Sequence, residues 1–322
     1  MEKNKRKIVL LYPTFTDKHK KQISECAEKY GYSCIFCVDR EKAVNEAEDA
    51  EIVLAYETVV AKASKKLKWV CTPSAGVDHY HDLIAGTDIL LTNSSGAHSV
   101  TISEHIIMVT LEVMRKRMEY VRLASERKWE IGLPVRSIHG SRIVMAGTGN
   151  IGQETAKKLR AFEPESIIGI NKGGSNPDGL FDRIVPLTEI DSILPETDLL
   201  IMSLPSTSET KRLMTEERLR KLPVSAYLVN VGRGDAIDEK ALERILREGR
   251  LGGAALDVFE KEPLEPDNTL WECPNLVLTT HVAGNWTLPY TVDKVADFFT
   301  EDLINYCEGR PLNKLIDINI GY

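Results

Sequence analysis

The fold of this chain is decided by the stretch Ile143-Val144-Met145-Ala146-Gly147-Thr148-Gly149-Asn150-Ile151-Gly152. Its first four residues are apolar and predict a buried strand, and a helix is expected to open at Gln153. Glycines spaced as G-x-G-x-x-G between a strand and a helix form the fingerprint of a dinucleotide site. Gly147 allows the tight turn, Gly149 admits the pyrophosphate, and Gly152 lets the helix pack on the strand. Residues 147–152 are therefore candidate cofactor-binding residues, and the alternative at this point is a glycine-rich turn without a ligand.

Length and composition place the chain among ordinary globular proteins of about two domains. It has 322 residues, of which 43% are hydrophobic and 28% charged, and its formal net charge of −7 gives no indication of a nucleic-acid surface. The apolar run 8–12 is too short for a signal peptide, and no run approaches the roughly 20 apolar residues of a membrane span. We therefore expect a cytoplasmic protein with free thiols and with no nucleic-acid or membrane partner.

Short apolar runs that alternate with amphipathic segments predict an α/β fold with parallel sheets covered by helices. In the first part of the chain, strands are expected at 8–12, 33–38, 52–55, 69–72 and 89–92, with helices at 18–30 and 40–47. One long helix is expected at 102–128, with Ser99 or Thr101 as its N-cap and Glu104 as the capping-box partner of Thr101.

The second part of the chain is expected to form a doubly wound, Rossmann-type sheet around the fingerprint. Its strands are expected at 143–146, 166–171, 183–185, 199–204, 226–231, 254–258 and 276–279, and its later helices at 188–194, 215–222 and 238–247. A last helix at 291–308 and the tail 313–321 follow the completed sheet, so we expect them to return to the first unit. The predicted domains are 1–99 with 287–322, and 100–286, which carries the dinucleotide site.

A candidate anion site lies in the first unit, at residues 73–78, directly after a predicted strand. Ligands of open α/β sheets bind at the carboxyl ends of the strands. Successive backbone N–H groups of Ser74, Ala75 and Gly76 would bind a carboxylate there, although a plain turn is equally compatible with this stretch.

Three further segments follow consecutive predicted strands of the second unit, and they contain Arg233, Glu262 and His281. A cation, a carboxylate and an imidazole at one sheet edge suit hydride transfer to a 2-oxo acid. Arg233 would bind the substrate carboxylate and polarise the keto oxygen, and His281 would give that oxygen a proton. Glu262 would orient the imidazole and favour its protonated form. Each residue alone has an ordinary structural explanation, but their joint placement favours the catalytic one.

In order and spacing, the segments resemble the D-isomer-specific 2-hydroxyacid dehydrogenases over nearly the whole chain. The matching segments are S-A-G-V-D at 74–78, A-G-T-G-N-I-G at 146–152, S-L-P-S-T-S-E-T at 203–210, N-V-G-R-G at 230–234, A-L-D-V-F-E-K-E-P at 255–263 and T-T-H-V-A-G at 279–284. The resemblance implies a catalytic set of Arg233, Glu262 and His281, a nicotinamide contact from Asp257, and binding of the substrate carboxylate by the backbone of 74–78. The other cofactor-binding residues expected on this basis are Thr101, Leu204, Pro205, Thr210 and Val231.

The same resemblance implies a flavodoxin-like substrate-binding domain built from both chain ends, and homodimers formed around the nucleotide domain. Glyoxylate or hydroxypyruvate, reduced to the D-2-hydroxy acid, is the expected substrate. A 3-phosphoglycerate or D-lactate-type dehydrogenase is the alternative, although near 74–81 only His79 and His81 would attract a phosphate. A dinucleotide-sensing corepressor is the alternative from another class, and the complete Arg-Glu-His set argues against it. The chain stops at Tyr322, so we expect no C-terminal regulatory extension.

The end of the second fingerprint strand bears on the cofactor. NAD-dependent members usually carry an acidic residue there to bind the ribose 2′-hydroxyl. This chain has Asn171, which does not repel a 2′-phosphate, followed by Lys172 and Ser175, which would bind one. NADP is therefore favoured over NAD, with a solvated surface role for Lys172 as the alternative.

Two aromatic residues, Tyr56 and Trp286, are predicted to shape the substrate pocket and to favour a small or flat substrate side chain. Ordinary packing explains them equally well. No metal site is expected.

Overall fold

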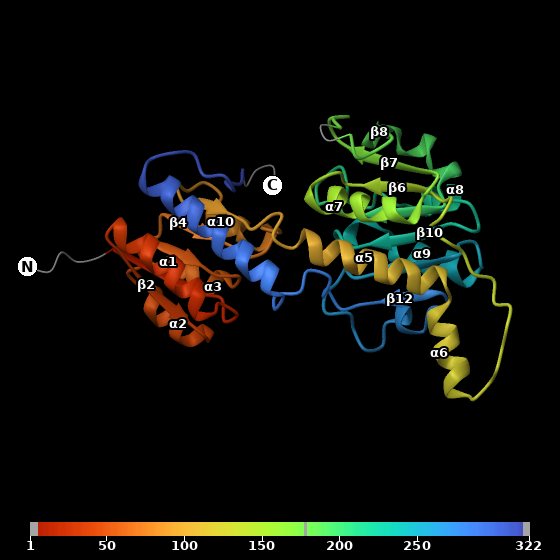
Figure 1. Cartoon of the computed structure of the whole chain (residues 1–322), viewed down its shortest axis with the longest axis horizontal. Helices are drawn as coiled ribbons and strands as arrows, with labels where there is room; N and C mark the ends of the chain where they lie inside the picture. The colour runs from red at the N-terminus through yellow and green to blue at the C-terminus, as the bar shows by residue number, and fades with distance from the viewer. Residues whose placement is uncertain (1–5, 177–178, 318–322) are drawn as a thin grey trace, which may run out of the picture. The chain divides into compact units, whose positions relative to one another are not determined.

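The computed structural model describes residues 6–176 and 179–317, and the chain divides into two compact units (Figure 1). Unit 1 comprises Met1–His98 and Asn285–Tyr322, and unit 2 comprises Ser99–Gly284. The sequence placed the corresponding limits at residues 99 and 286. Residues 318–321 of the predicted tail lie outside the described residues.

Unit 1 contains a five-stranded parallel sheet with the order β2-β1-β3-β4-β5, which is the flavodoxin-like order. Its strands are β1 (Arg6–Leu11), β2 (Tyr32–Cys37), β3 (Ile52–Leu54), β4 (Trp69–Cys71) and β5 (Leu90–Thr92). Its helices are α1 (Asp17–Lys29), α2 (Arg40–Ala47), α3 (Thr58–Lys62), α4 (His81–Ile84) and α10 (Pro289–Cys307). The short helices α3 and α4 were not anticipated from the sequence.

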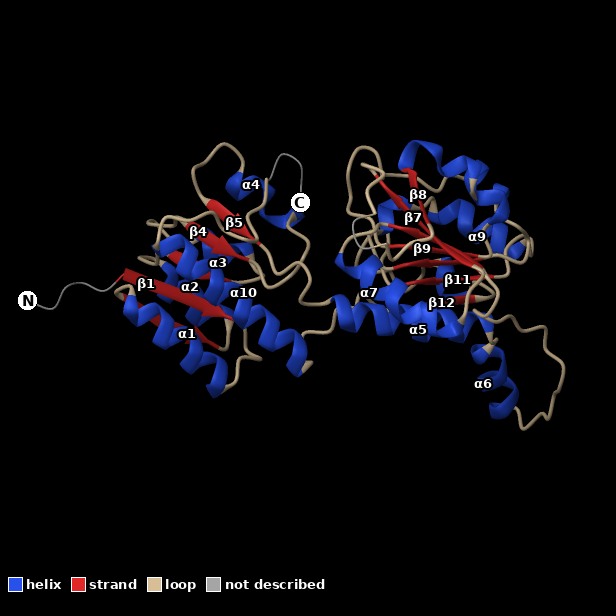
Figure 2. Cartoon of the chain, turned by 45° about the horizontal axis from the view of Figure 1, so that its top comes forward, coloured by secondary structure: helices blue, strands red, loops and turns tan. Residues whose placement is uncertain are grey.

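Alternation along β1 explains why helices cover both faces of this sheet, as Figure 2 shows. Ile8 and Leu10 pack in one cluster with residues of α1 and α10, whereas Val9 and Leu11 pack in another with residues of α2 and α3. The return of the C-terminal helix is confirmed, since Phe299 of α10 stacks on Trp69 with ring centroids 5.3 Å apart. The described part of the tail also pairs with this unit, because the Ile316 amide donates to the Leu91 carbonyl.

Unit 2 contains a seven-stranded parallel sheet with the order β12-β11-β10-β9-β6-β7-β8. Its strands are β6 (Arg142–Ala146), β7 (Ser166–Asn171), β8 (Arg183–Pro186), β9 (Leu199–Met202), β10 (Tyr227–Asn230), β11 (Gly253–Leu256) and β12 (Leu276–Leu278). The chain winds outward from β6 in both directions, so the predicted Rossmann-type sheet is confirmed, and its topological switch point lies between β6 and β9.

Helices cover both faces of this second sheet as well. On one face α5 (Ser99–Met114) and α7 (Asn150–Leu159) pack on Ile143 and Met145 of β6. On the other face α8 (Glu216–Lys221) and α9 (Glu239–Arg247) pack in the cluster that contains Val144 and Ala146. No helix within the described ranges combines the length and the apolar character needed to cross a membrane.

Three sequence predictions in unit 2 are wrong in detail. The expected helix 102–128 is two helices, α5 and α6 (Arg117–Ser125), because Lys116 adopts a left-handed conformation with φ of 54°. Its ammonium group donates to the Gly252 carbonyl and to the Asn275 side chain, which holds the chain at the break. Because α5 begins at Ser99, both Ser99 and Thr101 lie inside the first turn of the helix and not at the N-cap position before it.

The helix predicted at 188–194 is replaced by two short 3-10 segments, Leu187–Ser192 and Leu194–Glu196. Pro186 and Pro195 flank and interrupt this region, and neither can supply the backbone N–H that a continuous α-helix requires.

Candidate functional site

The three segments with the predicted catalytic residues leave adjacent strands on the same edge of the unit 2 sheet. Arg233 follows β10, Glu262 follows β11, and His281 follows β12. The turn before Arg233 is fixed by Asn230, whose side-chain amide donates to the Arg233 carbonyl at 2.9 Å and accepts from the Gly232 amide at 3.0 Å. The Arg233 guanidinium donates to the Gly232 carbonyl at 2.8 Å. The loop therefore has a defined course at the ligand-binding edge.

Close backbone contact joins the Arg233 loop to the segment that leads to Glu262. A Cβ atom on Gly234 would lie 1.8 Å from the carbonyl carbon of Phe259, so only glycine fits there. The Phe259 amide in turn donates to Oε1 of Glu262 at 3.0 Å. Arg233 and Glu262 are thus carried by two segments in direct backbone contact.

Glu262 and His281 form the contact that the sequence predicted. The second carboxylate oxygen of Glu262, Oε2, lies 2.7 Å from Nδ1 of His281. About half of the His281 side chain and about a third of the Glu262 side chain are exposed. The pair is therefore held in a fixed geometry while the imidazole stays accessible to a ligand.

Asp257 is buried beneath this pair. Its carboxylate accepts hydrogen bonds from the Thr279 hydroxyl at 2.6 Å and from the Val282 and Ala283 amides at 2.9 and 3.0 Å. Its carbonyl oxygen accepts from the His281 amide at 2.8 Å. The sequence suggested a nicotinamide contact for Asp257. In the structure, Asp257 holds the turn that presents His281.

Two residues of this network, Thr279 and His105, were not singled out from the sequence. Nε2 of His105, on α5, lies 3.1 Å from the Thr279 hydroxyl oxygen. Burial lowers the pKa of His105 from its ordinary value. The position of Thr279 directly after a strand could have marked it in the sequence as a candidate site residue. His105 gave no signal, because a single histidine in an apolar helix usually has a packing role.

The fingerprint forms the expected strand-turn-helix, and α7 begins at Asn150. Gly147 has a φ of +104°, and a Cβ atom on Gly152 would lie 2.1 Å from the Gly147 carbonyl oxygen. Both positions therefore require glycine, and the tight turn directs the first amides of α7 toward the sheet edge. This cradle fits the pyrophosphate of a dinucleotide.

Asn171, at the end of β7, fastens the turn beside this cradle. Its side-chain amide donates to the Thr148 hydroxyl at 2.8 Å and to the Ser175 carbonyl at 2.9 Å, while its oxygen accepts from the Gly174 amide at 2.5 Å. Lys172 forms an ion pair of 3.2 Å with Glu209, and both side chains are mostly exposed. The structure thus brings Asn171 and Ser175 together, while Lys172 already has an acidic neighbour that the sequence had not suggested.

The remaining predicted cofactor residues lie on the loops after β9 and β10 and on α5. The hydroxyl of Thr210 donates to the Pro205 carbonyl at 2.6 Å, which closes the loop after β9. Leu204, Val231 and Thr101 are buried.

The predicted carboxylate-binding segment of unit 1 is a tight turn after β4. The Ser74 hydroxyl donates to the Gly76 carbonyl at 2.7 Å, and Asn93 donates to the Ala75 carbonyl at 2.8 Å. Tyr56 and Trp286 are brought together in the same unit, with ring centroids 5.4 Å apart in an edge-to-face arrangement and with both side chains partly exposed.

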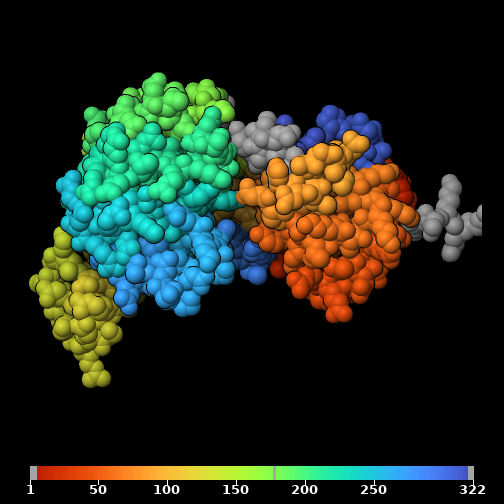
Figure 3. Space-filling model, turned by 180° about the vertical axis from the view of Figure 1, so that it is seen from behind, coloured from red at the N-terminus to blue at the C-terminus, as the bar shows by residue number. Residues whose placement is uncertain are grey.

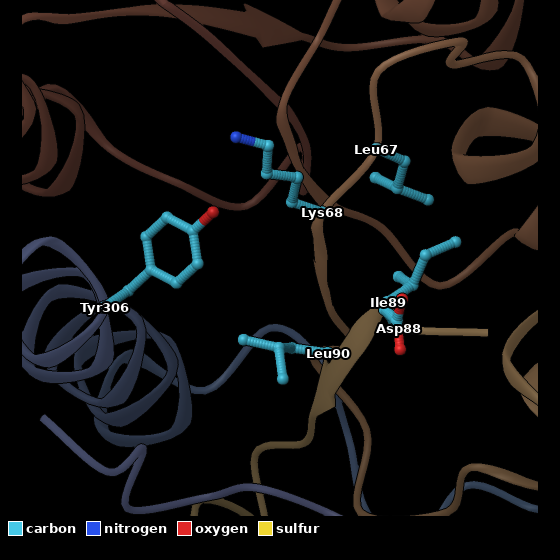
Figure 4. Close-up of a pocket in the computed structure, with 6 residues that line it drawn as sticks. All are labelled: Leu67, Lys68, Asp88, Ile89, Leu90 and Tyr306. Atoms are coloured by element: carbon cyan, nitrogen blue, oxygen red, sulfur yellow. The ribbon is translucent and has the colours of Figure 1, made fainter. Parts of the chain in front are cut away.

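A hollow of about 440 Å³ lies elsewhere in unit 1, at the amino ends of β4 and β5 (Figure 4). It is lined by Leu67, Lys68, Asp88, Ile89, Leu90 and Tyr306. Because Ser74–Gly76 follows the carboxyl end of β4, the hollow is at the opposite edge of the sheet and is not the predicted site.

Comparison with known proteins gives consistent results. The family model described as "D-isomer specific 2-hydroxyacid dehydrogenase, NAD binding domain" matches residues 107–283. A D-3-phosphoglycerate dehydrogenase of Archaeoglobus fulgidus is 29% identical over 87% of this chain, which spans only 54% of that protein. A glyoxylate reductase of Thermofilum pendens is 32% identical over 76% of this chain and 75% of its own length. The solved structure of an NADPH-dependent glyoxylate/hydroxypyruvate reductase from Sinorhizobium meliloti, in complex with NADP and sulfate, has a TM-score of 0.81 and 25% identity, covering 99% of this chain and 100% of that one.

Proposed function

Since this chain belongs to the D-isomer specific 2-hydroxyacid dehydrogenase family, we propose that it reduces a small 2-oxo acid to the D-2-hydroxy acid with a nicotinamide dinucleotide. The observation that carries this proposal is the Glu262–His281 pair, held at 2.7 Å on the sheet edge that also carries Arg233. Paired residues of this kind supply a proton to an oxygen that gains negative charge. The relatives named glyoxylate reductase and glyoxylate/hydroxypyruvate reductase support the same reaction class.

Three side chains have separate roles in the proposed reaction. A nicotinamide dinucleotide held by residues 147–152 would supply the hydride for the keto carbon. His281 transfers a proton to the keto oxygen, so the C=O double bond becomes a C–O single bond, with one new C–H bond and one new O–H bond. Glu262 orients the imidazole by accepting from Nδ1, which directs Nε2 to the substrate. Arg233 binds the substrate carboxylate and stabilises the charge on the oxygen.

We assign cofactor binding to the cradle formed by residues 147–152. The glycine geometry leaves room for a pyrophosphate, and the N-terminus of α7 favours its negative charge. NADP is proposed over NAD, because no carboxylate ends β7 and because Lys172 lies close by. The exposed Lys172–Glu209 pair is weak enough for a 2′-phosphate to compete for the lysine. Measurement of kcat/KM for NADPH and NADH under matched conditions tests this choice, and a preference for NADH refutes it.

Glyoxylate or hydroxypyruvate is the proposed substrate. The Tyr56–Trp286 pair supports it, since partly exposed rings after β3 and before α10 suit a small or flat group. The backbone of Ser74, Ala75 and Gly76 is proposed to bind the substrate carboxylate. A 3-phosphoglycerate dehydrogenase activity is the second candidate, supported by the match to the D-3-phosphoglycerate dehydrogenase of Archaeoglobus fulgidus.

We also propose that the protein forms homodimers through α6 and the segment after it. This part projects from the rest of unit 2 as the yellow lobe in Figure 3. It exposes apolar side chains that a monomer would leave in water, namely Met118, Val121, Trp129 and Ile131. Light scattering at micromolar concentration tests this proposal, and a monomer there contradicts it.

The central experiment compares wild type with His281→Ala on a panel of 2-oxo acids, following oxidation of NADPH and NADH. We expect His281→Ala to lower kcat by about 10²- to 10⁴-fold while dinucleotide binding is retained. His139→Ala is the matched control, because His139 is an exposed histidine of the same unit that also faces a glutamate, Glu163. Near-wild-type turnover of His281→Ala would falsify the mechanism. Dinucleotide binding without turnover of any 2-oxo acid in wild type would favour the corepressor alternative.

A further inference from the structure

The turn that presents His281 has an unfavourable backbone conformation. His281 has a φ of 55°, in the left-handed region that residues with a Cβ atom seldom occupy. Such a conformation persists only where the surrounding contacts impose it. Asp257 supplies three of those contacts, through the amides of His281, Val282 and Ala283. The orientation of the imidazole therefore depends on how firmly the Asp257 carboxylate itself is held.

A short chain of side chains connects Asp257 to helix α5. The Thr279 hydroxyl lies 2.6 Å from Oδ1 of Asp257 and 3.1 Å from Nε2 of His105. Nε2 of His105 is 3.8 Å from the same carboxylate oxygen, too far for a direct hydrogen bond. The hydroxyl therefore mediates the contact between the helix and the carboxylate.

The direction of these hydrogen bonds follows from the number of protons available. A hydroxyl has one proton, and at 2.6 Å from a carboxylate oxygen the Thr279 proton is donated to Asp257. Thr279 must then accept from His105, which requires a proton on Nε2. Burial lowers the pKa of His105, so the neutral imidazole with its hydrogen on Nε2 is the form that fits. The side chain of His105 is only 9% exposed, so water does not readily replace it as donor.

We propose that His105 is a positioning residue for the catalytic turn, acting on His281 through Thr279 and Asp257. It touches neither substrate nor cofactor in this role, and it sets the rate of the proton-transfer step rather than the affinity for ligands. A misplacement of about 1 Å costs on the order of 100-fold in rate. The inference rests on the proposed function, because it assumes that His281 supplies the proton.

Two substitutions of His105 separate its hydrogen bond from its packing. His105→Leu keeps an apolar side chain of similar size but removes the donor, whereas His105→Gln places an amide N–H near the position of Nε2. We expect His105→Leu to lower kcat about 10- to 100-fold, with KM for the 2-oxo acid and the cofactor Kd changed less than about twofold. His105→Gln should recover most of the lost kcat. A loss confined to KM, or an equal loss in both variants, overturns the proposal.

Thr279→Val provides an independent test, since it removes the hydroxyl and nearly preserves the shape of the side chain. If His105 acts through Thr279, His105→Leu adds no further loss of kcat in the Thr279→Val background. Losses that multiply in the double variant overturn the proposal. Thr279→Ser keeps the hydroxyl and should retain kcat, so the comparison of Val with Ser at this position remains decisive even if His105→Leu does not fold.

The same experiments distinguish a failure of this inference from a failure of the proposed function. If wild type reduces no 2-oxo acid, or if His281→Ala is as active as wild type, both are refuted. If wild type and His281→Ala behave as expected while His105→Leu keeps its kcat, only the positioning role of His105 is refuted.

Discussion

Replacing Asp257 by asparagine tests whether the buried carboxylate holds the turn at His281. Asp257 is 3% exposed, and its two oxygens accept three hydrogen bonds, two on Oδ1 and one on Oδ2. Asparagine has the same shape but only one acceptor oxygen. If that oxygen takes the place of Oδ1, the new amide N–H group faces the Ala283 amide at about 3.0 Å, so two donors meet.

The cost of this change follows from the contacts. One hydrogen bond to a charged group is lost, worth about 1.5–3 kcal/mol, and one buried N–H is left without an acceptor, at about 1–3 kcal/mol. The opposite orientation of the amide is worse, because its N–H group would then meet the donor of the Val282 amide and the Thr279 hydroxyl proton would lose its acceptor. We therefore expect Asp257→Asn to lower the free energy of unfolding by about 2.5–6 kcal/mol, a large part of a typical total of about 5–15 kcal/mol.

Urea unfolding gives the global effect, and hydrogen exchange at the Val282 and Ala283 amides gives the local one. Asp39→Asn is the control, because Asp39 caps α2 through the Lys42 amide at 2.8 Å and asparagine caps equally well. The control should change stability by less than about 0.5 kcal/mol. The reasoning is refuted if Asp257→Asn unfolds within about 1 kcal/mol of wild type and both amides keep their protection.

Two further predictions concern the fingerprint and a glutamate beside the site. Gly152→Ala should abolish dinucleotide binding, measured by calorimetry, while unit 1 stays folded. The Cβ atom of the new alanine would lie 2.1 Å from the Gly147 carbonyl oxygen and would force the turn apart. An unchanged affinity for the dinucleotide contradicts this prediction. Burial, with added repulsion from Glu260 and Glu262, raises the pKa of Glu239 from 4.5 to about 7. The stability that the protonated Glu239 contributes is therefore complete below about pH 4.5 and is lost as the pH rises to about 7. Glu239→Gln should therefore remove a fall of about 1–2 kcal/mol in stability between these pH values, after allowance for solvent screening, and an unchanged pH dependence of Tm would refute it.

The sheets could be predicted from the sequence because parallel strands buried on both faces read as short apolar runs. The flavodoxin-like order of unit 1 followed from the family resemblance, and the structure confirms it. The break between α5 and α6 could not be predicted. Lys116 adopts its left-handed conformation with two bonds to Gly252 and Asn275, more than 130 residues away in the sequence, and lysine itself gives no local signal for such a conformation.

The predicted site residues were found because each follows a strand, and strand ends are easy to locate in sequence. The roles of Asp257 and His105, which hold the site residues in place, could not be predicted for a physical reason. Whether Asp257 faces a ligand or the turn at 279–283 depends on the backbone of that turn, and His281 with its φ of 55° has no sequence signature there. His105 lies on a helix whose neighbouring residues are apolar, so periodicity assigned that helix to packing and gave no indication of a polar contact.

The two glycines beside Arg233 explain how the loops of the site are held in fixed positions relative to one another. Neither has a positive φ, so conformational freedom does not explain them. A Cβ atom on Gly232 would lie 2.6 Å from the Leu204 carbonyl oxygen, and one on Gly234 would lie 1.8 Å from the Phe259 carbonyl carbon. The loops after β9, β10 and β11 therefore touch backbone to backbone, with no side chain between them whose rotamer could change. Because backbone contacts of this kind are stiffer than side-chain packing, the position of Arg233 relative to the Glu262 segment is set by the fold itself, and the flexible part of the proposed site is reduced to the turn that Asp257 holds.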